Sequence, residues 1–125
     1  MLVEDTGLEL NCLGGLPGPF IKFFLKRLGA EKLFEIANQL GDVRARAVTI
    51  VACECNGVRT ITTGAVSGTL VLPAGSLGFG FDIIFKPDSA SVTYAQMSVE
   101  EKSQISHRSL AMRNLRSALQ ASCRS

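Results

Sequence analysis

Apolar residues recur at helical spacing in the first third of the chain and again near its end. Residues 20–28 place a stripe of them on one face: Ile21, Phe24, Leu25 and Leu28. Phe20 and Phe23 add a second apolar side, so this helix is predicted to be buried on two flanks. A second helix is predicted over residues 30–40, and a C-terminal one from His107 to about residue 121.

Start and stop signals support these boundaries. Pro19 is well placed to open the first helix, and glycines at positions 29 and 41 follow the first two helices. Ser98 and Glu101 have the spacing of a capping box, which predicts a short helix from there to about residue 105. Ser106 can cap the last helix.

The middle of the chain has the pattern of a β-hairpin. Residues 44–55 read as a strand that is almost wholly apolar from Ala47 to Cys53, and we expect it to be covered on both faces. Asn56-Gly57 favours a type I′ turn. The return strand, residues 58–71, carries Gly64 and Gly68, which indicate a bulge or the close approach of another element.

The remaining segments are short. Residues 2–3 read as the end of a strand, followed by a turn at residues 4–7 and by a loop at 11–19 too rich in glycine and proline for regular structure. Another short strand is predicted at residues 83–85. This order of elements predicts one α/β domain over residues 1–125, with a mixed sheet flanked by helices.

Composition narrows the function classes. The 125 residues are 46% hydrophobic, with no apolar run approaching the ~20 residues of a membrane span, and we expect no membrane partner. A net charge of +2 is too small to indicate nucleic acid. Four cysteines lack the spacing of a disulfide framework or a zinc site, which predicts reduced thiols in a cytoplasmic protein: Cys12, Cys53, Cys55 and Cys123.

Acidic and basic side chains near the N-terminus suggest phosphate chemistry. Glu4 and Asp5 are candidates for a divalent cation, since carboxylates at a strand end commonly hold Mg²⁺ beside phosphates; a solvated turn is the alternative. Lys22 lies on a largely apolar helix and is either a phosphate contact or a lysine that extends to solvent.

A glycine-phenylalanine loop and a basic helix start are the other candidates. Phe79 and Phe81 alternate with glycines before Asp82 and could stack on a nucleobase, or else fill the core. His107-Arg108 begins a helix, where the dipole disfavours cations, and this suggests a functional role. The alternative pairs Arg108 with Glu100 or Glu101 and makes His107 structural.

Three motifs carry a family resemblance: VEDTGLELNCLGGLPGPFIKFF, then GFGFD, then EK followed by SHR. Together they resemble the inosine triphosphate pyrophosphatase family. The resemblance implies a two-lobed fold with the nucleotide in the cleft between lobes. It also implies Mg²⁺-dependent hydrolysis of ITP, dITP and XTP to monophosphate and pyrophosphate, which cleanses the nucleotide pool. Mn²⁺ is the alternative cation, and a homodimer is expected.

The resemblance also implies roles for individual residues. Asp5 would be the catalytic carboxylate and metal ligand, with Thr6 beside it, while Lys22 and Lys102 would neutralise phosphate charge. Phe79 would stack on the purine. The remaining residues would line the base and sugar pocket or present donors to the 6-keto oxygen: Gly80, Phe81, Asp82, Ser106, His107 and Arg108. Adenine has an amino group in place of the 6-keto oxygen, so a donor aimed there would meet another donor. Each buried group left without a hydrogen-bond partner costs about 1–3 kcal/mol, which disfavours adenine.

The sequence departs from the family pattern in several places. Ala74, Ile83 and Gln96 stand where relatives usually carry an arginine, a proline and an acidic residue, and Phe81 replaces a larger aromatic. The family's opening strand, its S/T-x-N-x-x-K phosphate loop and a second metal carboxylate have no counterpart in the sequence. The chain is therefore expected to start inside the domain and to hydrolyse little on its own.

Two other functions remain open. One is a non-catalytic nucleotide-binding or dimerisation fragment of the same fold. The other is an RNA-binding module that uses Phe79 and Phe81 with the basic C-terminal helix.

Overall fold

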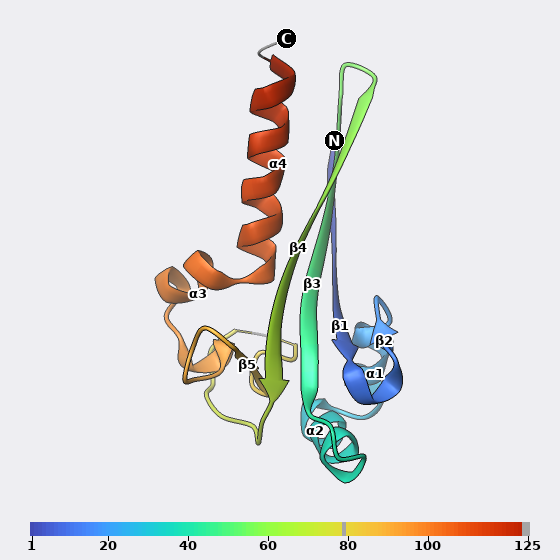
Figure 1. Cartoon of the computed structure of the whole chain (residues 1–125), viewed down its shortest axis with the longest axis vertical. Helices are drawn as coiled ribbons and strands as arrows, with labels where there is room; N and C mark the ends of the chain where they lie inside the picture. Colours follow the sequence, from blue (N-terminus) through green and yellow to red (C-terminus); the bar gives the residue numbers. More distant parts are fainter. Residues whose placement is uncertain (79, 124–125) are drawn as a thin grey trace.

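A single sheet with helices around it forms the body of the molecule (Figure 1). The computed structural model describes residues 1–78 and 80–123. The five strands lie in the order β2-β1-β3-β4-β5, and each of the four described pairings is antiparallel. The α/β class is confirmed. The described strands contain no parallel pair of the kind that would make the sheet mixed.

The predicted helices and the hairpin are confirmed, with small shifts at their ends. The strands are β1 (Leu2–Leu10), β2 (Pro17–Gly18), β3 (Arg44–Cys55), β4 (Val58–Leu70) and β5 (Phe85–Pro87). The α-helices are α1 (Ile21–Arg27), α2 (Ala30–Gln39), α3 (Val99–Ile105) and α4 (His107–Cys123). Two short 3₁₀ helices, η1 (Asn11–Leu13) and η2 (Tyr94–Gln96), complete the described elements. Within the described residues no helix has the length and apolar character needed to cross a membrane.

Predicted turn and cap signals also form as expected. Asn56 and Gly57 both have positive φ, 54° and 79°, as a type I′ turn requires. The side chain of Ser98 accepts a hydrogen bond from the backbone N–H of Glu101, which completes the capping box of α3. The hairpin register runs unbroken from one end to the other, so neither glycine of β4 marks a bulge.

Gly64 of β4 instead marks the closest approach of α4 to the sheet. A Cβ atom at this position would collide with the carbonyl oxygen of His107 and the backbone nitrogen of Ala111. Two hydrogen bonds hold the helix against the same strand: Thr62 Oγ1 donates to the carbonyl of Ala111 at 3.0 Å, and Asn114 Nδ2 donates to the carbonyl of Thr63 at 2.9 Å. The start of α4 is therefore fixed in position by backbone contact.

The N-terminal prediction was wrong in its boundaries. The strand does not end at Val3: β1 continues to Leu10, paired along its length with β3. Nine cross-strand pairs outweigh the turn propensity of Glu4 to Gly7, and Gly7 lets the backbone of Gly18 come close. The loop predicted at residues 11–19 contains η1 and β2. The strand predicted at 83–85 lies two residues later, where it pairs with β4.

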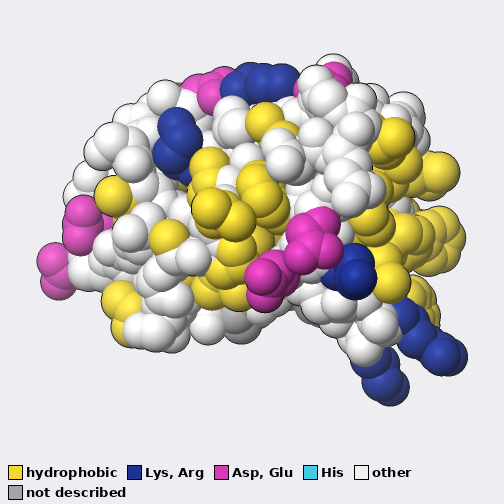
Figure 2. All heavy atoms as spheres, turned by 90° about the horizontal axis from the view of Figure 1, so that it is seen from below, with side chains coloured by type: hydrophobic (Ala, Val, Ile, Leu, Met, Phe, Trp, Pro, Cys, Tyr) yellow, Lys and Arg dark blue, Asp and Glu magenta, His cyan; other side chains and the backbone are white. Residues whose placement is uncertain are grey.

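Two burial predictions were also wrong. Helix α1 buries Ile21, whereas Phe20 and Phe23 are 57% and 64% exposed, because only one flank of the helix is covered. Hydrophobic side chains gather on the side of the molecule where α1 lies, at the right of Figure 2. In β3 the face that bears Val51 packs on α4, but Ile50 on the opposite face is 47% exposed.

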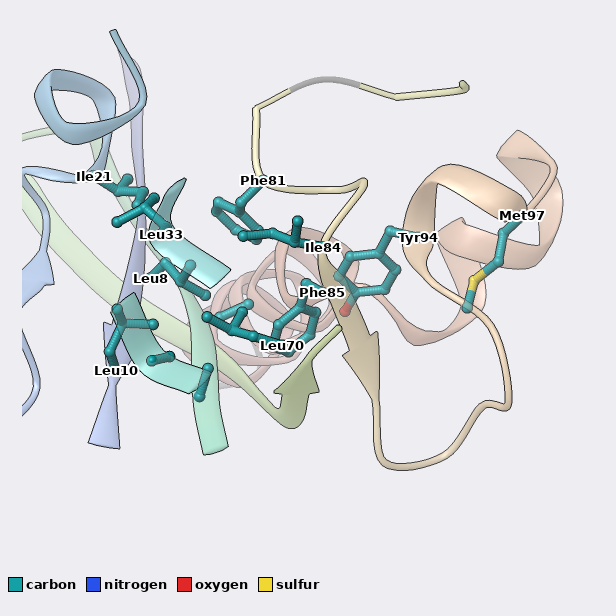
Figure 3. Close-up of a cluster of buried hydrophobic side chains, with 13 residues drawn as sticks. Leu8, Leu10, Ile21, Leu33, Leu70, Phe81, Ile84, Phe85, Tyr94 and Met97 are labelled. Atoms are coloured by element: carbon teal, nitrogen blue, oxygen red, sulfur yellow. The ribbon is translucent and has the colours of Figure 1, made fainter. Parts of the chain in front are cut away.

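The main core lies where the strand ends drawn in the lower half of Figure 1 meet the loop between β4 and α3. Leu8, Ile21 and Leu33 approach it from one side, and Tyr94 from the other (Figure 3). Phe81 and Phe85 cross between these two groups, with their rings edge-to-face at 6.0 Å between centroids. A smaller cluster under α4 contains Val51, Ala111 and Leu115, in keeping with the helical spacing of apolar residues predicted near the end of the chain.

Replacement of Gly64 by alanine tests the contact between α4 and β4. The added methyl must push α4 away from the strand, so we expect Gly64→Ala to lower the free energy of unfolding by about 1–3 kcal/mol. Urea denaturation followed by circular dichroism measures the change. Ser67→Ala, at an exposed position of β4, is the matched control and should stay within about 0.5 kcal/mol of wild type. Equal stability of Gly64→Ala and wild type would contradict this contact.

Candidate functional site

A cavity of about 850 Å³ opens between β1, α1, the loop residues 77–78 and 80–82, α3 and the start of α4. We call it the site cavity. This volume is in the range of small-molecule sites. The structure brings ten of the predicted site residues to its lining: Asp5, Thr6, Lys22, Gly80, Phe81, Asp82, Lys102, Ser106, His107 and Arg108. The predicted base-stacking residue, Phe79, lies outside the described residues.

The side chains of β1, which form one wall of the cavity, point alternately to the two faces of the sheet. The register with β3 is unbroken, so neighbouring side chains on β1 point to opposite faces of the sheet. Glu4 and Thr6 share the face of α4, where the hydroxyls of Thr6 and Thr49 lie 3.1 Å apart. Asp5 belongs to the other face. The two carboxylates therefore lie neither in a turn nor at a strand end, and they diverge.

The start of α4 forms the opposite wall. Ser106 is buried, and its hydroxyl accepts a hydrogen bond from the backbone N–H of Ser109 at 3.0 Å. Its predicted capping role is confirmed. Arg108 reaches across the cavity mouth, and its Nε donates to both carboxylate oxygens of Glu4, at 3.0 and 2.9 Å. The predicted alternative, a pair with Glu100 or Glu101, was wrong.

His107 sits between two aromatic rings. Its centroid lies 5.7 Å from that of Phe81 and 5.6 Å from that of Tyr94. The residue is buried, and its Nδ1 has no hydrogen-bond partner among the described residues. Burial lowers the pKa of His107 to about 4; Asp82 opposes this shift and Lys102 adds to it. At neutral pH the cavity therefore has an uncharged imidazole with a free hydrogen-bonding atom.

Asp82 and Lys102 form the most buried ion pair of the cavity. Lys102 Nζ donates to the Asp82 carboxylate at 2.6 Å and also lies over the ring of Tyr94, 5.6 Å from its centroid. Gly78, with φ at 78°, leaves room for that carboxylate, because a Cβ there would collide with it. Lys102 thus has an anionic partner in the cavity, and its role of neutralising phosphate charge stays a prediction.

Of the two phenylalanines of the loop, Phe81 is described, and its ring points into the core. Phe81 is only 5% exposed and packs on Phe85 and His107, so it forms the floor of the cavity. Because it is buried, Phe81 is not available at the surface for the base stacking on which the RNA-binding alternative depends. Gly80, with φ at 64°, provides the left-handed turn that directs Phe81 inward.

Several lining residues were missed by sequence reasoning. They come mainly from α1 and from the segment around η2: Ile21, Leu25, Tyr94, Met97, Ser98 and Val99. Tyr94 is the only tyrosine of the chain and is fully buried, with its hydroxyl donating to the carbonyl of Ile105 at 3.3 Å. Because the chain has one tyrosine, Tyr94 could have been singled out as a candidate from the sequence.

A divalent cation would find limited protein ligands here. Within residues 1–78 and 80–123 no three His, Cys, Asp or Glu side chains converge on one point. Mg²⁺ usually keeps several waters and is bound by one or two carboxylates together with substrate phosphates. Asp5 lines the cavity, and its carboxylate has no hydrogen bond or ion pair among the described residues. The donor set therefore fits a hydrated cation that is shared with phosphates.

Comparison with known proteins shows to which family the chain belongs. The Ham1 family model matches residues 1–118, nearly the whole chain. The chain belongs to the Ham1 family. It is 39% identical over 116 residues to an inosine triphosphate pyrophosphatase of Puccinia graminis f. sp. tritici, covering 92% of the chain and 60% of that relative. It is 36% identical to a dITP/XTP pyrophosphatase of Hyperthermus butylicus, with 92% and 61% covered.

Solved structures of Ham1 proteins have the same fold. The Ham1 protein of Staphylococcus aureus aligns with a TM-score of 0.80 at 33% identity, over 97% of this chain and 67% of that one. A HAM1 protein from Coxiella burnetii aligns with a TM-score of 0.85 at 28% identity, over 96% and 66%. The predicted family and fold are therefore confirmed. This Ham1 chain spans about three fifths of the length of the two curated relatives.

The lowered pKa of His107 makes stability depend on pH. The folded state keeps His107 neutral down to about pH 4, whereas the unfolded chain takes up a proton near its ordinary pKa of 6.5. The free energy of unfolding should therefore be greatest above pH 6.5. It should fall by at most about 1.4 kcal/mol per pH unit on going down toward pH 4.

Urea denaturation between pH 4 and pH 7 measures this effect. His107 is the only histidine of the chain, so His107→Gln should remove most of the slope between pH 5 and pH 6.5. An undiminished slope in that variant would assign the pH dependence to other groups.

Proposed function

We propose that this Ham1 chain provides the nucleotide site of a pyrophosphatase for non-standard purine nucleoside triphosphates, namely ITP, dITP and XTP. One observation carries the proposal: residues from motifs up to a hundred positions apart line a single cavity. The names of the two curated relatives support the substrate class. The reaction would release monophosphate and pyrophosphate.

The cavity has two chemically distinct ends. Phe81, Tyr94 and the neutral His107 form a largely apolar, hydrogen-bonding end that suits a purine. Lys22, exposed on α1, stands at the lining without an ion-pair partner among the described residues and suits phosphate. Arg108 lies at the α4 wall, where a donor can distinguish a 6-oxo purine from adenine.

We assign the cation to Mg²⁺, with Mn²⁺ as the alternative, and Asp5 as the carboxylate that would hold it. A bound divalent cation would neutralise phosphate charge and lower the pKa of the attacking water. Asp5 would also accept a hydrogen bond from that water and orient it. Of the other lining carboxylates, Glu4 is engaged by Arg108 and Asp82 by Lys102, so Asp5 is the one left to hold this cation.

A non-catalytic nucleotide-binding or dimerisation fragment remains the alternative, because a single carboxylate and one unpaired lysine form a sparse catalytic set. We further propose a cytoplasmic homodimer. The exposed side chains of Phe20 and Phe23 support dimerisation, since large exposed aromatic patches commonly mark interfaces.

Pyrophosphate release separates the enzyme from the fragment. With Mg²⁺ and ITP, the wild-type chain should release pyrophosphate slowly, and Asp5→Asn should release at least about a hundredfold less. An enzyme-coupled pyrophosphate assay measures both rates, with ATP as the competing substrate. Calorimetric binding of ITP without release of pyrophosphate would favour the fragment. Absence of both binding and release would refute the proposed function.

Lys22 should distinguish triphosphate from monophosphate. A charge-assisted hydrogen bond contributes about 1.5–3 kcal/mol, so Lys22→Ala should weaken ITP binding by roughly tenfold or more. IMP binding should change by less than about twofold, because this lysine is assigned to the distal phosphates. Lys26→Ala, one turn later on the same exposed face of α1 and outside the cavity, is the matched control. Equal losses for IMP and ITP would reassign Lys22 to a structural role.

A further inference from the structure

Glu4 and Arg108 join the two walls of the site cavity. They stand 104 residues apart in the sequence, one on β1 and the other in the first turn of α4. The contact is made through Nε of Arg108, which donates to both carboxylate oxygens at 3.0 and 2.9 Å. It is the only described ion pair between a strand and α4.

The two terminal nitrogens of the Arg108 guanidinium remain available to bind a ligand. A guanidinium has five N–H donors in a rigid plane, and Glu4 engages the one on Nε. The four donors on Nη1 and Nη2 have no hydrogen bond to any described residue, and Arg108 lines the cavity. A carboxylate that binds one edge of the plane fixes its orientation while the fork stays free for a ligand.

Fold stability does not account for this pair. The side chains of Arg108 and Glu4 are 58% and 40% exposed, and exposed ion pairs are commonly worth little in unfolding experiments. Metal binding does not account for Glu4 either. Its side chain points to the face opposite that of Asp5, and both of its oxygens already accept hydrogen bonds from Arg108.

We propose that Glu4 is a positioning residue: it orients the guanidinium of Arg108 so that the Nη donors face the purine, and it is not a ligand of the cation. The proposal rests on the proposed function, because it concerns discrimination between 6-oxo and 6-amino purines in the same cavity. The site then uses two carboxylates that are neighbours in the sequence for different purposes, with Asp5 on the phosphate side and Glu4 on the base side.

A double-mutant cycle on the full chain tests the positioning role. Dissociation constants for ITP and ATP with Mg²⁺ are measured by calorimetry for wild type, Glu4→Gln, Arg108→Gln and the double variant. Wild type should prefer ITP, and each single variant should lose at least about fivefold of that preference, a coupling of the size seen for residues in contact. The double variant should lose no more than Arg108→Gln alone. Arg108→Lys should not restore the preference, because an ammonium lacks the fork.

The chain offers a matched control for Glu4. Glu9 lies on the same strand and accepts a hydrogen bond from Nε of Arg46 at 3.0 Å, but it lies outside the site cavity. Glu9→Gln should leave the preference for ITP unchanged. Two further readouts are independent of the preference. Titration of Mn²⁺ followed by electron paramagnetic resonance should give the same affinity for Glu4→Gln and wild type. The Nε–H proton of Arg108 should exchange faster with solvent in Glu4→Gln.

The outcomes separate the two proposals. If the wild-type chain binds ITP and ATP equally, the proposed function fails and the positioning role fails with it. If wild type prefers ITP and Glu4→Gln keeps that preference, only the positioning role is overturned. Additive losses in the double variant, or a weaker affinity of Glu4→Gln for Mn²⁺, would overturn it as well.

Discussion

The contact between α4 and β4 at Gly64 determines where the predicted site residues at the start of α4 lie. Because the strand offers only a hydrogen atom there, the carbonyl of His107 comes to rest directly on the sheet. Ser106, His107 and Arg108 are consequently fixed with backbone precision rather than by flexible side chains. The imidazole then meets Phe81 and Tyr94, and the guanidinium comes within reach of β1. A cavity built in this way is preorganised for a flat ligand.

Signals that act over a few residues made much of this arrangement predictable. Capping by Ser98 and Ser106, the Asn56-Gly57 turn and the apolar stripe of α4 all depend on neighbours in the sequence, and all form as expected. The candidate site residues were predicted from a different kind of signal. The motifs that contain them match the Ham1 family, and the structure gathers ten of them around one cavity.

Features that depend on distant partners were not predictable. The Glu-Asp-Thr-Gly segment favours a turn when considered alone, but pairing with β3 extends it into a strand. Alternation along that strand then separates Glu4 from Asp5, which no local pattern indicates. The partner of Arg108 lies 104 residues away, and the hydrophobicity of Phe20 and Phe23 says nothing about whether an element covers them. Each of these errors concerns which distant element, if any, contacts the residue, and no local pattern encodes that.

The ion pair between Asp82 and Lys102 has a consequence for how a ligand arrives. The lining of the site cavity contains three acidic side chains, three basic ones and an imidazole that is neutral at pH 7. The described walls are therefore electrically balanced and create little net field to draw in a bare polyanion. A triphosphate that enters already bound to a divalent cation carries less charge and meets a smaller mismatch. Under the proposed function, the electroneutral walls would favour the metal–nucleotide complex as the species that enters.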